Sequence, residues 1–89
     1  MNEKMKKQQL AEQYKKEMVG FRYRHFKGGV YLVTDIAVHS ESDDLMVIYK
    51  SFDNTAYVWA RPLEMFLSEV DHEKYPEVEQ KMRFEKMAE

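Results

Sequence analysis

Short β-rich runs separated by turn residues fill most of the chain after Phe21, and this pattern constrains the fold more than any other feature. The breaks between the runs are Gly28-Gly29, "HSESDD" and "SFDNTA". Runs of this length are typical of strands, and glycine-rich or polar breaks are typical of hairpin turns. We therefore predict strands near residues 22–27, 30–38, 45–51 and 56–61, with Asp53-Asn54 as the third turn.

The last third of the chain is punctuated by two prolines. Pro62 fixes φ and has no N–H, so "RPLEMF" is predicted to end the fourth strand and make one helical or 3₁₀ turn. A short strand over "FLSEV" is expected next. Pro76 suits the first position of a short helix, "PEVEQ", and "KMRFEKM" then alternates as an edge strand does. One helix reaching the C terminus is the alternative for residues 76–89.

Residues 2–18 are rich in helix formers, with Asn2 as a cap and Gly20 as a stop. Leu10, Tyr14 and Met18 recur every four residues and form a narrow apolar stripe. This stripe is expected to pack on the chain's own domain; a homodimer contact is the alternative. We predict a helical extension over residues 1–20 and a single small β domain over residues 21–89.

These elements predict a mainly β fold, a small antiparallel, Src-homology-3-like, partly open barrel. It carries an N-terminal α-helix and a short helix before the last strand. Within the second strand, regular alternation predicts two apolar faces. One face holds Val30, Leu32, Ile36 and Val38, and the other holds Tyr31, Val33 and Ala37.

Composition excludes several chemistries. The chain has no cysteine, so it has no disulfide, thiolate zinc site or cysteine nucleophile. Residues 1–20 hold five lysines against three glutamates, and residues 21–89 hold nine Lys or Arg against thirteen Asp or Glu. Without a dominant basic field, duplex nucleic acid is not expected as a partner. No apolar run suits a membrane span or a signal peptide, so we expect a cytoplasmic protein with no membrane contact.

Polar residues at the strand ends are the candidate site. Alternation in the first strand would place Tyr23, His25 and Lys27 on one face, with Arg24 and Phe26 on the other. In the fourth strand, Tyr57, Trp59 and Arg61 share a face. A tryptophan beside an arginine can recognise a ring or an anion by stacking and paired donors. The alternative is that Trp59 belongs to the core and Arg61 braces a carboxylate such as Glu64.

Two histidines raise the question of catalysis. His25, His39 and Glu41 could bind a metal ion if their strands were neighbours, although their spacing is not a recognised metal signature. Ser40 follows His39 directly, and adjacent strand residues point to opposite faces, which argues against a Ser-His pair. We predict no cofactor and no metal.

Five segments together resemble a known family: "YRHFKGGVYLV", "AVHSES", "VIY", "VWARPLEMF" and "RFEKM". In this order and spacing they are similar to the bacterial family catalogued as domain of unknown function 1653. The similarity spans about Tyr23 to Val70, with a further match at Arg83-Phe84. The family's recurrent residues correspond to Tyr23, Arg24, His25, Lys27, Gly28, Tyr31, His39, Ser40, Glu41, Tyr49, Trp59, Arg61, Pro62, Met65 and Phe66. The resemblance implies that "RFEKM" is the last strand; it implies no activity.

Three functions compete. The leading hypothesis is a non-enzymatic binding module for a small anionic or nucleotide-like ligand or an anionic segment of a protein partner. Its ligand-binding residues would be His25, Lys27, His39, Glu41, Trp59 and Arg61. A metal- or histidine-dependent hydrolase is the second and requires His25 and His39 to approach each other. An assembly protein that dimerises through its N-terminal helix is the third.

Overall fold

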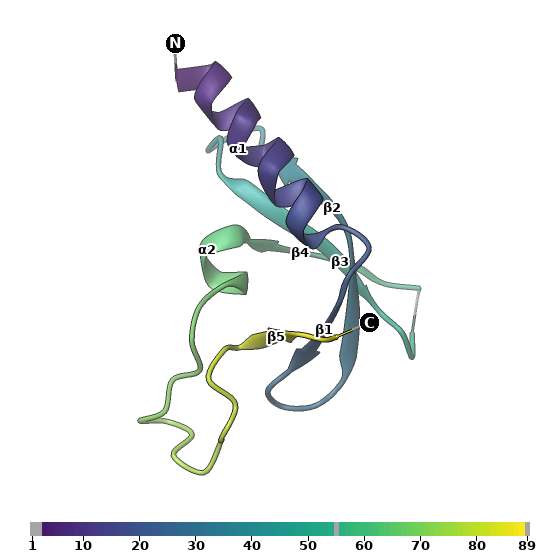
Figure 1. Cartoon of the computed structure of the whole chain (residues 1–89), viewed down its shortest axis with the longest axis vertical. Coiled ribbons are helices and arrows are strands. Elements are labelled where there is room, and N and C mark those ends of the chain that lie inside the picture. The colour runs from purple at the N-terminus through teal and green to yellow at the C-terminus, as the bar shows by residue number, and fades with distance from the viewer. Residues whose placement is uncertain (1–2, 55, 89) are drawn as a thin grey trace.

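The structure, a computed structural model, describes residues 3–54 and 56–88. An N-terminal helix precedes four strands, a one-turn helix and a last short strand (Figure 1). In chain order the elements are α1 (Glu3–Met18), β1 (Arg22–His25), β2 (Val30–Val38), β3 (Leu45–Ser51), β4 (Val58–Pro62), α2 (Leu63–Phe66) and β5 (Phe84–Lys86). No helix among the described residues is both long enough and apolar enough to cross a membrane.

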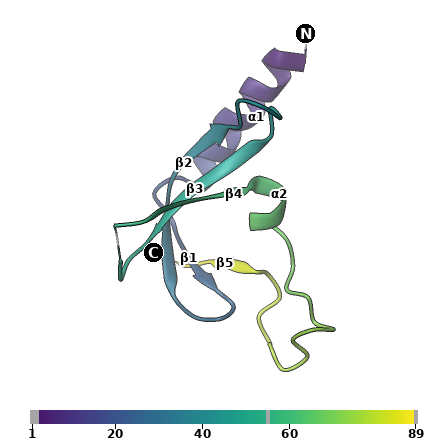
Figure 2. The ribbon, with the colours of Figure 1, turned by 180° about the vertical axis from the view of Figure 1, so that it is seen from behind.

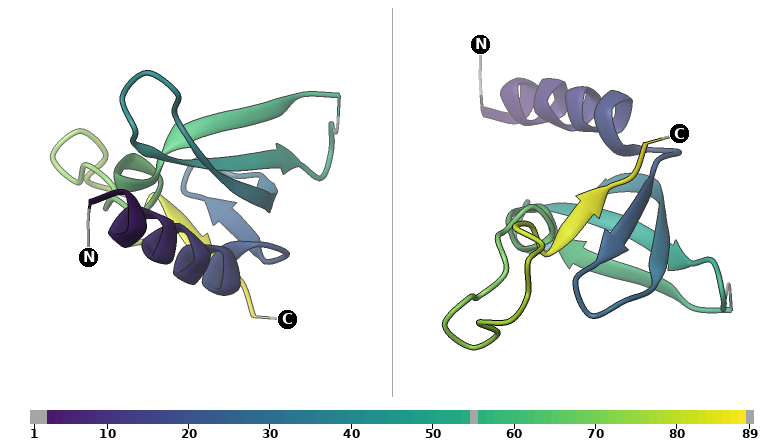
Figure 3. Two further views of the ribbon diagram at one scale, coloured as in Figure 1. Left: turned by 90° about the horizontal axis from the view of Figure 1, so that it is seen from above. Right: turned by 60° about the horizontal axis from the view of Figure 1, so that its bottom comes forward.

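The strands form one antiparallel sheet in the order β4-β3-β2-β1-β5 (Figure 3). Within the described chain, β4 and β5 are the two edges and do not pair, so the sheet is not closed. The predicted mainly β fold, with a helix before it and a short helix before the last strand, is therefore confirmed. The loop between α2 and β5 lies at the end of the molecule opposite α1 (Figures 1 and 2).

A β-bulge in β2 changes which residues face the core. Val33 pairs with Tyr49, but the next pair joins Asp35 to Ile48, so Thr34 is an extra residue. The bulge puts Ile36, three residues after Val33, on the same face as Val33. Regular alternation had placed these two residues on opposite faces, and that prediction was wrong. A bulge cannot be recognised from apolar periodicity alone, because β2 is apolar on both faces.

The segment between α2 and β5 contains less regular structure than predicted. The "PEVEQ" helix and the alternative helix to the C terminus are both wrong, because residues 76–83 form turns and coil. Most of this segment is exposed, and so short a helix has no buried face to stabilise it. The "FLSEV" strand is reduced to an isolated bridge between Glu69 and Met82. The predicted last strand is confirmed as β5.

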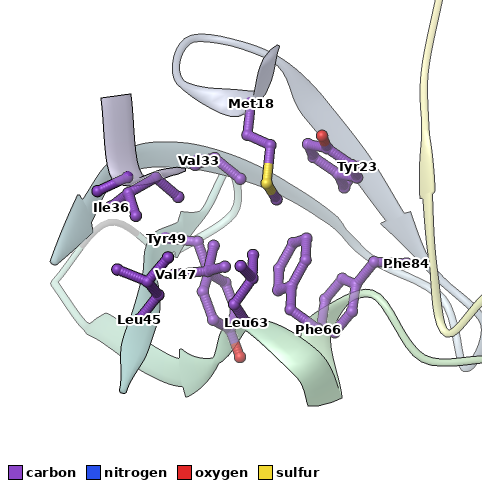
Figure 4. Close-up of a cluster of buried hydrophobic side chains, with 11 residues drawn as sticks. Met18, Tyr23, Val33, Ile36, Leu45, Val47, Tyr49, Leu63, Phe66 and Phe84 are labelled. Atoms are coloured by element: carbon purple, nitrogen blue, oxygen red, sulfur yellow. The ribbon is translucent and has the colours of Figure 1, made fainter. Parts of the chain in front are cut away.

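The core lies between the inner face of the sheet, α2 and one end of α1 (Figure 4). Phe66, Val33 and Val47 are its most completely buried large side chains. The other buried residues of this cluster are Ala11, Met18, Tyr23, Ile36, Leu45, Tyr49, Leu63 and Phe84. α1 packs on β2 through Met18 and Ala11, whereas Leu10 remains 42% exposed. The predicted stripe was therefore wrong at Leu10.

Candidate functional site

Cationic side chains gather around a hollow of about 420 Å³ beside the β1–β2 turn. Its walls come from the end of β1, the following turn, β4 and the loop before β5. The lining residues are His25, Phe26, Lys27, Arg61, Asp71, Lys74, Tyr75 and Arg83. Two lysines and two arginines thus face the same volume as one carboxylate. The hollow is a local positive site on a chain whose net charge is −2.

The double glycine shapes one wall. Gly28 and Gly29 have φ values of 102° and 88°, a region that side-chain-bearing residues avoid. The turn is closed by the N–H of Gly28, which donates to the His25 carbonyl oxygen at 2.9 Å. Because β1 ends at His25, Phe26 and Lys27 lie in the turn and strand alternation does not apply to them. The predicted separation of Phe26 from His25 was wrong: their rings stack at 4.7 Å.

His25 is held at the base of the turn. Its Nδ1 accepts a hydrogen bond from the N–H of Lys27 at 3.1 Å, and its ring meets the edge of Phe84 at 4.8 Å. Burial lowers the pKa of His25, and the positive charges of Arg61, Lys27 and Arg83 lower it further. The imidazole is therefore disposed to be neutral, and it gains a proton more readily when an anion enters the hollow.

Arg61 reaches the hollow from the edge strand β4. Its Nε donates to the Tyr49 hydroxyl at 3.3 Å, and its guanidinium carbon lies 5.5 Å from the centre of the Phe84 ring. Among the described residues no ion pair joins Arg61 to Glu64, so the predicted carboxylate brace is not observed. The guanidinium is instead oriented by two aromatic residues, and it has further donors available for a ligand.

The loop before β5 adds Asp71, Lys74 and Tyr75 to the hollow through a local turn. Asp71 Oδ1 accepts from the N–H groups of Glu73 and Lys74 at 3.1 and 3.3 Å, and the Tyr75 N–H donates to the Asp71 carbonyl oxygen at 2.9 Å. Lys27 and Lys74 lie 5.1 and 5.5 Å from the centre of the Tyr75 ring. Hydrogen bonding from Lys27 lowers the pKa of the Tyr75 hydroxyl, and the charges of both lysines add to this effect.

Arg83 contributes a buried donor. Its Nε is buried and has no hydrogen-bond partner among the described residues, although its carbonyl oxygen accepts from the Phe26 N–H at 3.0 Å. A buried donor without a partner costs about 1–3 kcal/mol, and more for a charged group. Such a group in the wall of a cationic hollow is a reason to expect an acceptor there.

The structure brings together three of the six predicted ligand residues, His25, Lys27 and Arg61. His39 and Glu41 lie in the β2–β3 loop, at the other end of β2 from the β1–β2 turn. There the His39 Nδ1 accepts from the N–H groups of Glu41 and Ser42 at 3.1 and 3.3 Å, which is a turn-forming role.

The two histidines are consequently far apart. β2 separates their loops, and a strand of nine residues spans about 26 Å from its first to its last Cα. The arrangement of His25, His39 and Glu41 required for a metal site is therefore contradicted. Within residues 3–54 and 56–88, no three His, Cys, Asp or Glu side chains are grouped to hold a metal ion.

Trp59 lies on β4, directly opposite Tyr49, and is 49% exposed. It does not belong to the buried core, so the row of Tyr57 and Trp59 is an exposed platform, one of the two predicted alternatives. Trp59 is two residues from Arg61 on the same strand face, but it does not line the hollow.

Sequence reasoning did not select Asp71, Lys74, Tyr75 or Arg83 as site residues. Arg83 did stand in the "RFEKM" segment of the resemblance, which is the one signal that pointed to it. Lys74 and Tyr75 belong to a segment without strand alternation, so no pattern related them to the β1–β2 turn.

The comparisons with known proteins identify a family and add no activity. A family model described as protein of unknown function (DUF1653) matches residues 21–86. No curated protein and no solved structure matches the chain. The matched residues include β1 to β5 and every residue that lines the hollow. Because that match covers most of the chain, this protein belongs to the DUF1653 family.

Proposed function

We propose that this protein is a binding module whose cationic hollow takes an anionic group of a small molecule or of a partner protein. The observation that carries the proposal is the convergence of Lys27, Arg61, Lys74 and Arg83 on one volume that holds a single carboxylate. Cations placed together without matching carboxylates repel one another, and an anion relieves that repulsion. Phosphate and carboxylate groups are the ligands that arginine and lysine recognise best.

The cationic side chains of the hollow differ in how firmly they are oriented. Arg61 is oriented by Tyr49 and Phe84, so it is prepared for a ligand before the ligand arrives. Arg83 lines the hollow and adds a second guanidinium charge to it. Lys27 and Lys74 are exposed and flexible, and they can close over an anion from the solvent side.

Finer features of the sequence hypothesis remain predictions. A nucleotide-like ligand would place its phosphate in the hollow and its ring on Trp59, which is exposed on the same face as Arg61. A contribution from His39 and Glu41 would need a ligand long enough to extend along β2. The Src-homology-3-like classification and the cytoplasmic location are likewise still predictions.

Isothermal titration calorimetry with pyrophosphate, citrate and adenosine monophosphate tests the proposal. The double variant Lys27→Gln/Lys74→Gln should weaken binding about a hundredfold or more, because each of the two lost charge-assisted contacts contributes about 1.5–3 kcal/mol. The matched control is Lys6→Gln/Lys16→Gln on the exposed face of α1, which changes the net charge equally far from the hollow. Equal weakening in both double variants would mean that only net charge matters and would contradict a specific site.

Amide chemical shifts locate the site independently. Titrating pyrophosphate should move the signals of Lys27, Lys74 and Arg83 and leave those of the β2–β3 loop unchanged. The absence of any shift near the hollow with all three anions at millimolar concentration would overturn the proposal.

A further inference from the structure

The free edge of β4 is apolar at its start, and the protecting proline, Pro62, lies only at its C-terminal end. Tyr57, Val58 and Trp59 are 60%, 64% and 49% exposed. Proteins normally guard such an edge with charged side chains, because its unpaired backbone groups can pair with another strand. Here the segment "AYVWA", residues 56–60, contains no charge. The first charged residue is Arg61, whose guanidinium turns inward to the Tyr49 hydroxyl.

Pro62 shows which backbone N–H and C=O groups of β4 face β3 and which face the free edge. Proline has no N–H, so the pair that Pro62 forms with Met46 must be of the type without direct hydrogen bonds. The two types alternate along an antiparallel ladder, and β4 pairs with β3 without a register shift. The N–H and C=O groups of Val58 and Ala60 therefore point away from β3, toward the free edge.

The same segment is nearly a palindrome centred on Val58. Ala56 and Ala60 lie at equal distances on either side of Val58, and so do Tyr57 and Trp59. β4 begins at Val58, so pairing centred on Val58 requires residues 56 and 57 to extend the strand. An antiparallel copy of the same sequence would then place Ala60 opposite Ala56 and Trp59 opposite Tyr57. We propose that a second copy of this chain pairs with β4 along its free edge, with the two Val58 residues facing each other across a two-fold axis.

In this register the outward backbone groups of Val58 are hydrogen-bonded and the aromatic side chains are in contact. Val58 exchanges two hydrogen bonds with Val58 of the second copy, because its N–H and C=O groups both face the free edge. On either side of Val58, Tyr57 lies opposite Trp59 of the second copy, and Trp59 lies opposite its Tyr57. These two pairs are of the type without direct hydrogen bonds. In such pairs the Cα atoms are about 4.5 Å apart, close enough for aromatic side chains to contact across the strands.

The chemistry favours a second copy over an unrelated extended peptide. An isologous interface requires a surface that is complementary to itself under a two-fold rotation, and the "AYVWA" order meets that requirement. The central segment carries no charge that would repel its own copy. The inference does not depend on the proposed anion site, since Val58 does not line the hollow.

The test is the molar mass of the full chain in solution, measured by sedimentation equilibrium. Wild type is expected to be a dimer. Val58→Pro removes the outward N–H without removing a bond to β3, so it should be a monomer, whereas Val58→Ala keeps the N–H and should remain dimeric. A wild type that is monomeric at millimolar concentration would overturn the inference, and so would a dimer that Val58→Pro leaves intact.

A charge exchange tests the register without introducing proline. Val58→Lys and Val58→Glu place like charges across the axis, so each variant alone should be monomeric, and an equimolar mixture should form a heterodimer. Leu10→Lys, on the exposed side of α1, should leave the dimer unchanged. Loss of the dimer in Leu10→Lys together with retention in the Val58 variants would assign the contact to the helix and refute the β4 interface.

Discussion

The rings of Phe66 and Phe84 stack face to face, with their centres 4.1 Å apart and their planes 8° from parallel. The contact joins α2 to β5, two elements separated by an irregular loop. That loop carries Asp71, Lys74 and Tyr75, and the stack holds its two ends together. The Phe26 and Tyr75 rings, 5.1 Å apart, and the hydrogen bond that Gln80 Nε2 donates to the Arg24 carbonyl oxygen join the loop directly to β1 and its turn. Core packing and the candidate site are therefore connected in part through this stack.

Replacing Phe84 tests this connection. Phe84→Ala should lower the free energy of unfolding by about 3–5 kcal/mol, because it removes a buried ring and leaves a cavity. A urea denaturation curve measures the change. Leu67→Ala, at an exposed position next to α2, is the control and should cost far less. A loss for Phe84→Ala no larger than for this control would show that the stack is not part of the core.

The turn before β2 depends on glycine at position 28. Gly28→Ala introduces a Cβ where φ is 102°, and although no atom lies within 4 Å of that Cβ, the backbone conformation itself is strained. We expect a loss of about 1–2 kcal/mol. Because Lys27 precedes this residue, the variant should also weaken anion binding. The single variant Lys27→Ala, which keeps Gly28, should weaken anion binding but leave the urea midpoint almost unchanged.

The lowered pKa of His25 should make the stability of the fold depend on pH. Burial and the neighbouring cations lower its pKa in the folded state, so between its ordinary value of about 6.5 and that lower value the unfolded chain binds more protons. The free energy of unfolding should therefore fall as the pH drops below about 6.5, and His25 should contribute no pH dependence above it. Urea denaturation at several pH values, for wild type and His25→Gln, measures the slope. The same slope in both proteins would refute this assignment.

Tyr75 reports on the charge of the hollow. Since Lys27 lowers the pKa of the Tyr75 hydroxyl first by a hydrogen bond and then by its charge, Lys27→Gln should raise that pKa toward its ordinary value. Titration of the Tyr75 ring signals by NMR follows the change. Lys16→Gln, on α1, should leave it unaffected. No difference between wild type and Lys27→Gln would place the lysine away from the ring.

The bulge in β2 makes a prediction about deletions. Deleting Thr34 removes the extra residue and leaves Val33 and Ile36 on the core face, so the chain should still fold. The deletion removes one hydrogen bond, which the Thr34 hydroxyl donates to the Ile48 carbonyl oxygen. Deleting Leu32 instead moves Tyr31 and the residues before it to the wrong face. Circular dichroism and thermal unfolding compare the two deletions. Equal stability would contradict the assigned register.

The sequence by itself determined the order of the N-terminal helix, β1 to β4 and α2, because apolar alternation, turn residues and proline act over a few neighbouring residues. Between α2 and β5 it wrongly predicted a helix, and the strand predicted there is only an isolated bridge. It also identified His25, Lys27 and Arg61 as candidates, through their positions at strand ends. Only the tertiary structure decided that Ile36 shares a face with Val33, since an extra residue in an apolar strand leaves no periodic signal. It alone brought Lys74 and Tyr75 to the β1–β2 turn, because an irregular loop is positioned by tertiary contacts, here the stacking of Phe66 on Phe84 and the contact between the Phe26 and Tyr75 rings.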